Sequence, residues 1–200
     1  MSRQLNAKVY ADVSTAQPPA TARDDDNALM ELALRRDADA FALLVRAYWP
    51  PLAAYARRLL NGNREAAEDL AQEVFLRIWN GRLRWRPIGS VRAFLYGLIR
   101  HLALNERRSI RVRLRAVGRI RATLREWYER PSPLELVEQA EERSAIEHAI
   151  ASLPPRRREI FILVRVHGMS YGEVAQILDI SPQTVANQMS AALSTLRRLL

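Results

Sequence analysis

Apolar residues recur at spacings of three and four along most of the chain, a period typical of helices that bury one face. No stretch alternates apolar and polar residues over a useful length, so we expect no β-strands. A short helix is predicted from Ala28, and a second one follows the N-cap candidate Asp37. Pro50 and Pro51 should kink or restart this second helix before residues 61–63 end it.

The same period predicts further helices downstream. One covers residues 65–79 and closes at Asn80-Gly81, and the next follows the N-cap candidate Ser90. A later helix ends at Pro154-Pro155, and another covers residues 156–167 before Gly168 stops it.

Two segments lack this pattern and divide the chain. Residues 1–26 carry a Pro-Pro pair and three consecutive Asp residues, so we expect a flexible tail. Residues 109–133 are basic, weakly periodic and punctuated by Pro131 and Pro133, which favours a linker. We therefore predict an all-α fold with two small helical domains, residues 27–108 and 134–200, joined by a flexible linker.

A helix-turn-helix motif is predicted in the C-terminal domain. Ser170 and Glu173 have the spacing of a capping box, and Ser181-Pro182 supplies an N-cap followed by proline at the first helical position. Ala175 is small where two helices must cross closely, and Val185 is placed to pack the second helix on the first. The alternative is an ordinary helical hairpin whose small residues serve packing.

In a helix-turn-helix the N-terminal part of the second helix enters the major groove. Asn and Gln side chains pair with adenine there, and Ala or Thr methyl groups contact thymine. The candidate base-contacting residues are Gln183, Thr184, Ala186, Asn187, Gln188 and Ser190. Residues 170–200 carry two Arg and two acidic residues, so phosphate attraction must come from the preceding helix, whose candidates are Arg156, Arg157 and Arg158.

The charge distribution also favours binding to nucleic acid. The chain has a formal net charge of +9, and residues 82–125 hold thirteen Arg against Glu106 alone. A basic excess concentrated in one block is the electrostatic footprint of phosphate binding. A solvated, arginine-rich linker is the alternative.

Composition excludes several other classes. The chain has no Cys, which excludes disulfides, thiolate metal sites and Cys nucleophiles. No apolar run approaches the about 20 residues that span a bilayer, and no secretion signal precedes residue 28, so we expect a cytoplasmic protein. No carboxylates or His residues cluster at catalytic or metal-site spacing, so we expect neither an enzyme nor a cofactor or metal site.

The predicted helix over residues 65–79 has an acidic outer face. Burying its apolar stripe leaves Glu68, Asp69, Gln72, Glu73 and Leu76 outward. Such a face on a basic protein suits a protein partner, although the spacing alone favours the alternative, a solvated face.

A basic, aromatic segment follows that helix. Cations mixed with aromatic rings and amides hold single-stranded nucleic acid by charge neutralisation and base stacking. Trp85 and Tyr96 are equally suited to a core position. The candidate residues are Arg84, Trp85, Arg86, Tyr96, Arg100, His101, Asn105, Arg107 and Arg108.

The order of these motifs resembles that of the bacterial extracytoplasmic-function (ECF) sigma factors. The resemblance runs from about residue 28 to residue 200, broken only by the linker. It rests on Phe41, Leu44 and Tyr48, the stretch of residues 67–79, Arg92 to Arg108, Leu153-Pro154-Pro155-Arg156 and the terminal helix-turn-helix.

The resemblance implies a subunit that binds core RNA polymerase, carries it to promoter DNA and helps to open the duplex. The stretch that docks on polymerase in that family matches Asp69, Gln72, Glu73, Phe75 and Leu76. The region matching Arg84 to Arg108 reads and melts the minus-ten element, and the helix-turn-helix reads the minus-thirty-five element. Residues 184–193 resemble subgroups that pair with membrane-anchored anti-sigma factors, which implies such a partner.

This sequence departs from the family pattern at several positions. Phe94, His101 and Asn105 stand where the family commonly has Trp, Asn and Asp, and residues 186–192 lack the usual Arg or Lys. The family's base contacts therefore do not carry over at these positions. A stand-alone helix-turn-helix regulator is the alternative function, but it needs a dimer interface, and no heptad seam is visible.

Overall fold

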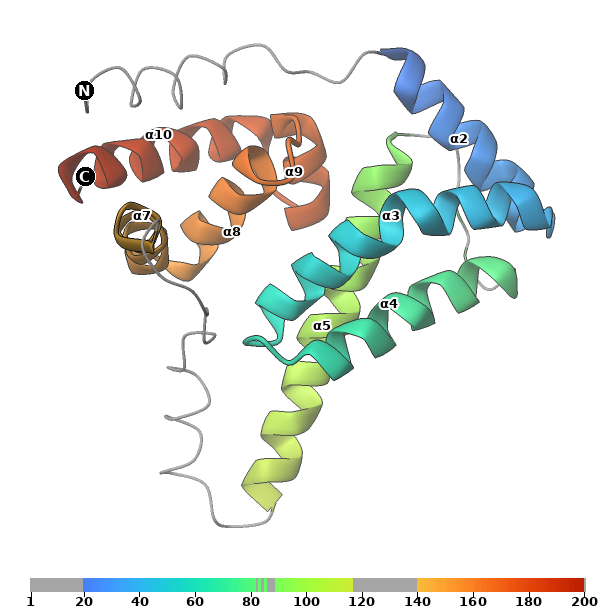
Figure 1. Ribbon diagram of the computed structural model, residues 1–200, viewed down its shortest axis with the longest axis horizontal. Coiled ribbons are helices and arrows are strands. Elements are labelled where there is room, and N and C mark those ends of the chain that lie inside the picture. The colour runs from blue at the N-terminus through green and yellow to red at the C-terminus, as the bar shows by residue number, and fades with distance from the viewer. Residues whose placement is uncertain (1–19, 82, 84, 86–88, 117–139, 200) are drawn as a thin grey trace. The chain divides into compact units, whose positions relative to one another are not determined.

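The computed structural model describes residues 20–81, 83, 85, 89–116 and 140–199. The described chain is helical and contains no strand, which confirms the predicted fold class. The helices, labelled in Figure 1, are α2 (Ala20–Leu34), α3 (Ala38–Leu59), α4 (Arg64–Trp79), α5 (Val91–Ala116), α7 (Ala140–Ser152), α8 (Pro155–Arg165), α9 (Tyr171–Leu178) and α10 (Pro182–Leu199). None of these helices is long and apolar enough to cross a membrane.

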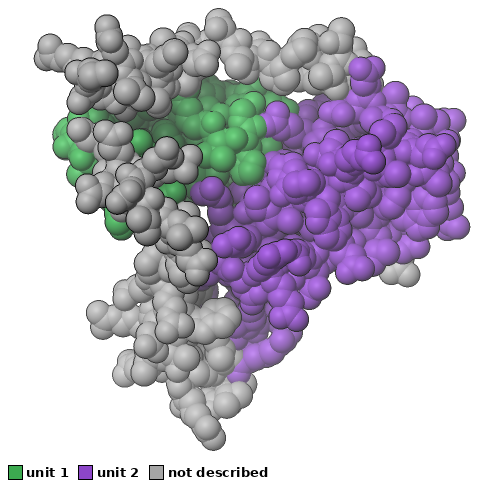
Figure 2. Space-filling view, viewed as in Figure 1, with its two compact units in different colours: residues 1–22, 136–200 green, residues 23–135 purple. Residues whose placement is uncertain are grey.

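The helices belong to two compact units, which Figure 2 distinguishes by colour. One unit holds α3, α4, α5 and most of α2, and the other holds α7 to α10.

The first unit is built on α3, α4 and α5, which pack pairwise against one another. Two of these three helices begin where the sequence predicts a cap. Asp37 accepts a hydrogen bond from the backbone N–H of Ala40 at 2.8 Å, and Ser90 accepts one from Ala93 at 3.3 Å. The fully buried side chains between the helices include Leu44, Leu52, Ala71, Val74, Ile78, Leu95 and Ile99.

Pro50 and Pro51 do not restart α3, which is one continuous helix with both prolines inside, although its ribbon bends along its length (Figure 1). The two prolines remove the hydrogen bonds to the carbonyls of Arg46 and Ala47. Both of those residues are exposed, so water can satisfy the carbonyls. Buried residues on either side, Tyr48 and Leu52, hold the two halves of the helix in the core.

Two predicted boundaries are wrong. The segment expected to be a flexible tail is helical from Ala20, and the Tyr48 hydroxyl donates a hydrogen bond to the Asp26 carboxylate. At the other end of the unit, α5 continues to Ala116, so residues 109–116 of the expected linker are helical. Weak apolar periodicity in the sequence hid both extensions.

The second unit packs α8, α9 and α10 against one another, and α7 joins them through α10. Ala149 and Leu153 form a buried cluster with Ala192 and Leu196, and Phe161 of α8 packs against it. Other buried residues of the unit include Ile160, Leu163, Val174, Val185 and Met189. The core thus fixes α9 and α10 as a pair, which positions the predicted recognition helix.

Candidate functional site

The helix-turn-helix forms as the sequence predicts. Ser170 accepts a hydrogen bond from the N–H of Glu173, whose carboxylate in turn accepts one from the N–H of Ser170 at 2.9 Å. Asp179 ends α9 with φ of 53°, a left-handed conformation that turns the chain. Ser181 then accepts a hydrogen bond from the N–H of Thr184 at 3.1 Å, and α10 begins at Pro182.

The polar side chains predicted to read bases lie on the outer side of α10. Val185, Met189, Ala192 and Leu196 are its buried stripe. Of the candidates, Ala186 and Gln188 are half-buried and the exposed ones are Gln183, Thr184, Asn187 and Ser190. Most of their hydrogen bonds are local, because Gln183 donates to Asn187 at 3.1 Å and the Thr184 and Ser181 hydroxyls lie 2.9 Å apart.

The three arginines at the start of α8 each contact a different helix. Arg156 donates to the carbonyl of Leu178 at the end of α9 at 2.7 Å. Arg157 donates from Nε to Oε1 of Gln188 on α10 at 3.3 Å. Arg158 donates to the carbonyl of Ala151, in the last turn of α7, and to that of Leu153, just after α7. The sequence predicted phosphate contacts for these residues, but it gave no sign that they link helices.

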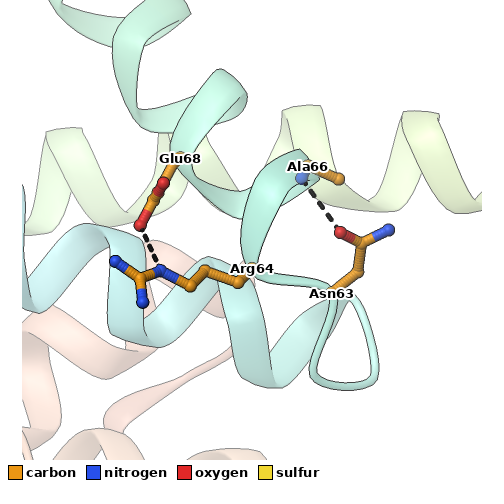
Figure 3. Close-up of polar contacts among 4 residues, drawn as sticks. All are labelled: Asn63, Arg64, Ala66 and Glu68. Atoms are coloured by element: carbon orange, nitrogen blue, oxygen red, sulfur yellow. Dashed lines mark hydrogen bonds and ion pairs between the residues drawn. The ribbon is translucent and has the colours of Figure 1, made fainter.

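The acidic face of α4 is present, but two of its carboxylates are already paired within the helix. Figure 3 shows Asn63, which caps the N–H of Ala66 at 3.0 Å, beside the ion pair between Arg64 and Glu68 at 2.7 Å. The Glu68 carboxylate raises the pKa of the Arg64 guanidinium by accepting its hydrogen bond. Glu73 pairs in the same way with Arg77 at 2.6 Å.

Asp69 differs from its acidic neighbours. It is exposed, and within the described part of the chain no side chain pairs with it. Gln72 is exposed beside it, and Leu76 is an apolar side chain left 45% exposed. Asp69, Gln72 and Leu76 recur at spacings of three and four, so the three side chains share one outer face of α4.

Phe75 does not belong to this surface, and its assignment to the polymerase-binding set is corrected. It is only 3% exposed. Its ring stacks on Trp49 with centroids 5.8 Å apart and meets the edge of Phe41. Phe75 follows Ala71 by four residues and precedes Ile78 by three, a spacing that places it in the buried stripe.

Tyr96 is likewise a core residue, so it is removed from the candidate stacking surface. It is 2% exposed, and its ring lies 5.2 Å from that of Tyr55. Burial raises the pKa of the Tyr96 hydroxyl to about 12, with the nearby Arg92 charge opposing the rise. Its position three residues before Ile99 is the signal that predicts burial.

The remaining candidates of this region are distributed along α5 and the segment before it. Trp85 is half-buried, and Arg84 and Arg86 lie outside the described residues. His101 and Asn105 are exposed one helical turn apart, and their side-chain nitrogens lie 2.9 Å apart. Arg100 and Arg107 are half-buried and Arg108 is exposed.

Two further arginines of α5 extend this basic surface. Arg111 and Arg113 are exposed on the part of α5 that was expected to be linker. Both residues lie within the basic block of residues 82–125, which was the sequence signal for adding them to the candidate nucleic-acid-binding residues. In the described part of the chain, no group of three or more His, Asp or Glu residues is arranged to hold a metal ion.

Comparison with known families finds two matches in this order along the chain. Residues 44–113 match the model described as sigma-70 region 2, and residues 143–196 match the model described as sigma-70 region 4. The first match covers α4 and most of α3 and α5, and the second covers α8, α9 and most of α7 and α10.

Curated relatives of the chain include ECF RNA polymerase sigma factors. The chain is 30% identical over 190 residues to the ECF RNA polymerase sigma factor ShbA of Streptomyces griseus, a match that covers 88% of this chain and 98% of the relative. It is also 30% identical over 144 residues to the ECF RNA polymerase sigma factor SigE of Mycolicibacterium smegmatis. That match covers 69% of this chain and 53% of SigE, so the chain spans about half the length of that relative.

A solved structure shares the fold. The sigma factor RpoE from Bartonella quintana, crystallised with the anti-sigma factor NepR, matches with a TM-score of 0.61 and 21% sequence identity. The match covers 80% of this chain and 95% of that one.

Proposed function

The chain belongs to the ECF RNA polymerase sigma factors, and on this premise we propose that it binds core RNA polymerase and directs it to promoters with two recognition elements. The observation that carries the proposal is the pairing of a region 2 match with a region 4 match, in this order, each on a separate compact unit. A stand-alone regulator with a helix-turn-helix has no need of the first unit.

The outer face of α4 is the proposed polymerase-binding surface. Asp69 supplies an exposed carboxylate that pairs with no side chain in the described part of the chain, Gln72 supplies an amide, and Leu76 an exposed apolar group. Glu73 belongs to the same surface, although its pairing with Arg77 reduces the charge it can offer. The proposed contact is therefore centred on Asp69 and Leu76.

The outer surface of α5 is proposed to hold the melted strand of the minus-ten element. His101 and Asn105 offer hydrogen-bonding groups at adjacent turns, and Trp85, which is half-buried, is the proposed stacking residue. Arg100, Arg107 and Arg108 neutralise backbone phosphates in this proposal. Arg84 and Arg86 remain part of the proposal from the sequence alone.

The recognition helix α10 is proposed to read the minus-thirty-five element as duplex. Residues 170–200 carry no net charge, so this unit alone attracts phosphate weakly. Weak binding suits a sigma factor because polymerase tethers both units near the promoter, which raises the effective concentration of each for its element. We propose no catalytic role for the chain, and we place its action in the cytoplasm, where polymerase works.

An anti-sigma factor is the second proposed partner. The Bartonella relative was crystallised with one, and exposed apolar side chains occur on both units of this chain, including Leu43 and Leu76 on one and Val166 and Tyr171 on the other. An anti-sigma factor that covers Leu76 would compete directly with polymerase. A purified anti-sigma factor that binds this chain should therefore lower the amount of core polymerase that the chain retains.

Reconstitution with core polymerase tests the proposed function. Core enzyme plus the chain should transcribe from a subset of a randomised promoter library, and core enzyme alone should not. The isolated chain should bind the selected duplexes weakly. Tight and selective duplex binding by the isolated chain, with no effect on core polymerase, would contradict the proposal and favour a stand-alone regulator.

A further inference from the structure

Gln188 is held from outside its own helix. The other hydrogen bonds among the polar candidates of α10 join residues of that helix or its Ser181 cap, as with Gln183 and Asn187. Gln188 instead accepts a hydrogen bond from Nε of Arg157, 31 positions earlier on α8, at 3.3 Å. The helices α8 and α10 pack against each other, so a rigid core supports the two ends of this contact.

We propose that Arg157 is a positioning residue that orients the Gln188 amide and thereby sets the base that Gln188 prefers. This inference rests on the proposed function, because it assumes that α10 reads duplex DNA. It changes the role predicted for Arg157, from a contact with phosphate to a contact that shapes sequence specificity.

The chemistry of arginine fixes the orientation of the amide. A guanidinium group has five N–H donors and no acceptor, so only the carbonyl oxygen of Gln188 can face it. Gln188 is then left with its NH₂ group, a donor, to present to the DNA. Any second donor that approaches the same oxygen must also come close to the positive charge of Arg157.

This orientation selects between purines in the major groove. Adenine presents an acceptor at N7 and a donor at N6, whereas guanine presents acceptors at both N7 and O6. A free Gln pairs with adenine by accepting from N6 and donating to N7. With its oxygen committed to Arg157, Gln188 fits the acceptor-only edge of guanine better than the mixed edge of adenine.

Two substitutions at residue 157 test whether its donors orient Gln188. In Arg157→Lys, the ammonium group keeps the positive charge and, like arginine, offers only donors, so the Gln188 oxygen must still face it. In Arg157→Met, a side chain of similar reach carries neither donor nor charge. Only Arg157→Met therefore frees the Gln188 oxygen.

The experiment is transcription by reconstituted holoenzyme from promoters randomised across the minus-thirty-five element, with the output sequenced. Gln188→Ala identifies the base pair that Gln188 reads, since preference should be lost there alone. At that position, the wild-type chain and Arg157→Lys should prefer guanine over adenine by about fivefold or more, the lower end of what one good side-chain contact gives. Arg157→Met should lose this preference and gain adenine.

Several outcomes overturn the inference. A wild-type preference for adenine at this base pair contradicts the assigned orientation, and an unchanged preference in Arg157→Met contradicts the positioning role. A loss of output in Arg157→Met that is uniform over all bases leaves Arg157 as a phosphate contact only. If Gln188→Ala changes no base preference while transcription remains promoter-dependent, the inference fails and the proposed function stands. Absence of promoter-dependent transcription with the wild-type chain rejects both.

Discussion

Arg156 donates a hydrogen bond from Nη2 to the backbone carbonyl of Leu178 at 2.7 Å, which joins the first turn of α8 to the last residue of α9. The last four carbonyls of a helix lack partners within it, and a nearby cation also interacts favourably with the helix dipole. Arg156 therefore stabilises the turn of the helix-turn-helix from outside. The relationship is local in space but spans 22 positions of sequence.

Replacing Arg156 with Met should destabilise the C-terminal unit. The variant keeps most of the aliphatic stem and removes the charged donor, so we expect the free energy of unfolding to fall by about 1 kcal/mol. Urea unfolding followed by circular dichroism measures this change. Arg197→Met, at an exposed position near the end of α10, is the matched control and should alter stability by less than half as much. Equal losses in the two variants would show that the Leu178 contact contributes nothing.

Ser170→Ala should also lower stability, by about 1 kcal/mol, because it removes the acceptor that the N–H of Glu173 uses in the capping box. Glu173 is only 5% exposed, so its carboxylate would lose part of its hydrogen bonding in a buried setting. Ser194→Ala, at an exposed position within α10, is the control and should be neutral or slightly stabilising, since Ala favours helices. Thermal unfolding of the two variants compares them, and equal melting temperatures would refute the capping role.

The buried Tyr96 predicts a loss of stability at high pH. Its folded pKa of about 12 lies above the ordinary value of 10, because burial disfavours the phenolate. The unfolded chain therefore loses this proton first, so the contribution of Tyr96 is complete below pH 10 and falls as the pH rises towards 12. Between pH 9 and pH 11, the urea midpoint of the wild-type chain should fall more than that of Tyr96→Phe. Parallel pH profiles for the two proteins would show that Tyr96 is not responsible.

Cap residues and apolar spacing in the sequence predicted most of the helix ends. The sequence did not predict contacts between residues that are far apart along the chain. Asp37, Ser90 and Ser170 cap helices as their residue types and spacings predict, because a cap depends only on the next three residues. The helical period was consistent with burial of Tyr96, but an aromatic residue in a basic segment also suits stacking on bases, so the sequence left both interpretations open. The link from Arg157 to Gln188 gave no sequence signal, since it arises only when the core packs α8 against α10.

Charge reversal at Asp69 tests the polymerase-binding surface directly. Asp69→Arg places a cation where the proposed partner surface must complement a carboxylate, and like-charge contacts across an interface cost several kcal/mol. We expect retention of core polymerase by the chain to fall about tenfold or more, with a matching loss of promoter-dependent transcription. The helix itself should remain folded, because Asp69 is exposed and makes no ion pair within the described part of α4.

Glu31→Arg is the matched control for this change. Glu31 is an exposed carboxylate on α2, outside the proposed surface, and its reversal alters the net charge by the same amount. A general electrostatic effect on polymerase or DNA would make the two variants behave alike, whereas a specific contact at α4 predicts that Glu31→Arg retains wild-type recruitment. Normal initiation by Asp69→Arg would remove α4 from the polymerase interface. Salt titration adds a further distinction, since a contact centred on Asp69 should weaken steadily between about 0.05 and 0.3 M salt in the wild-type complex.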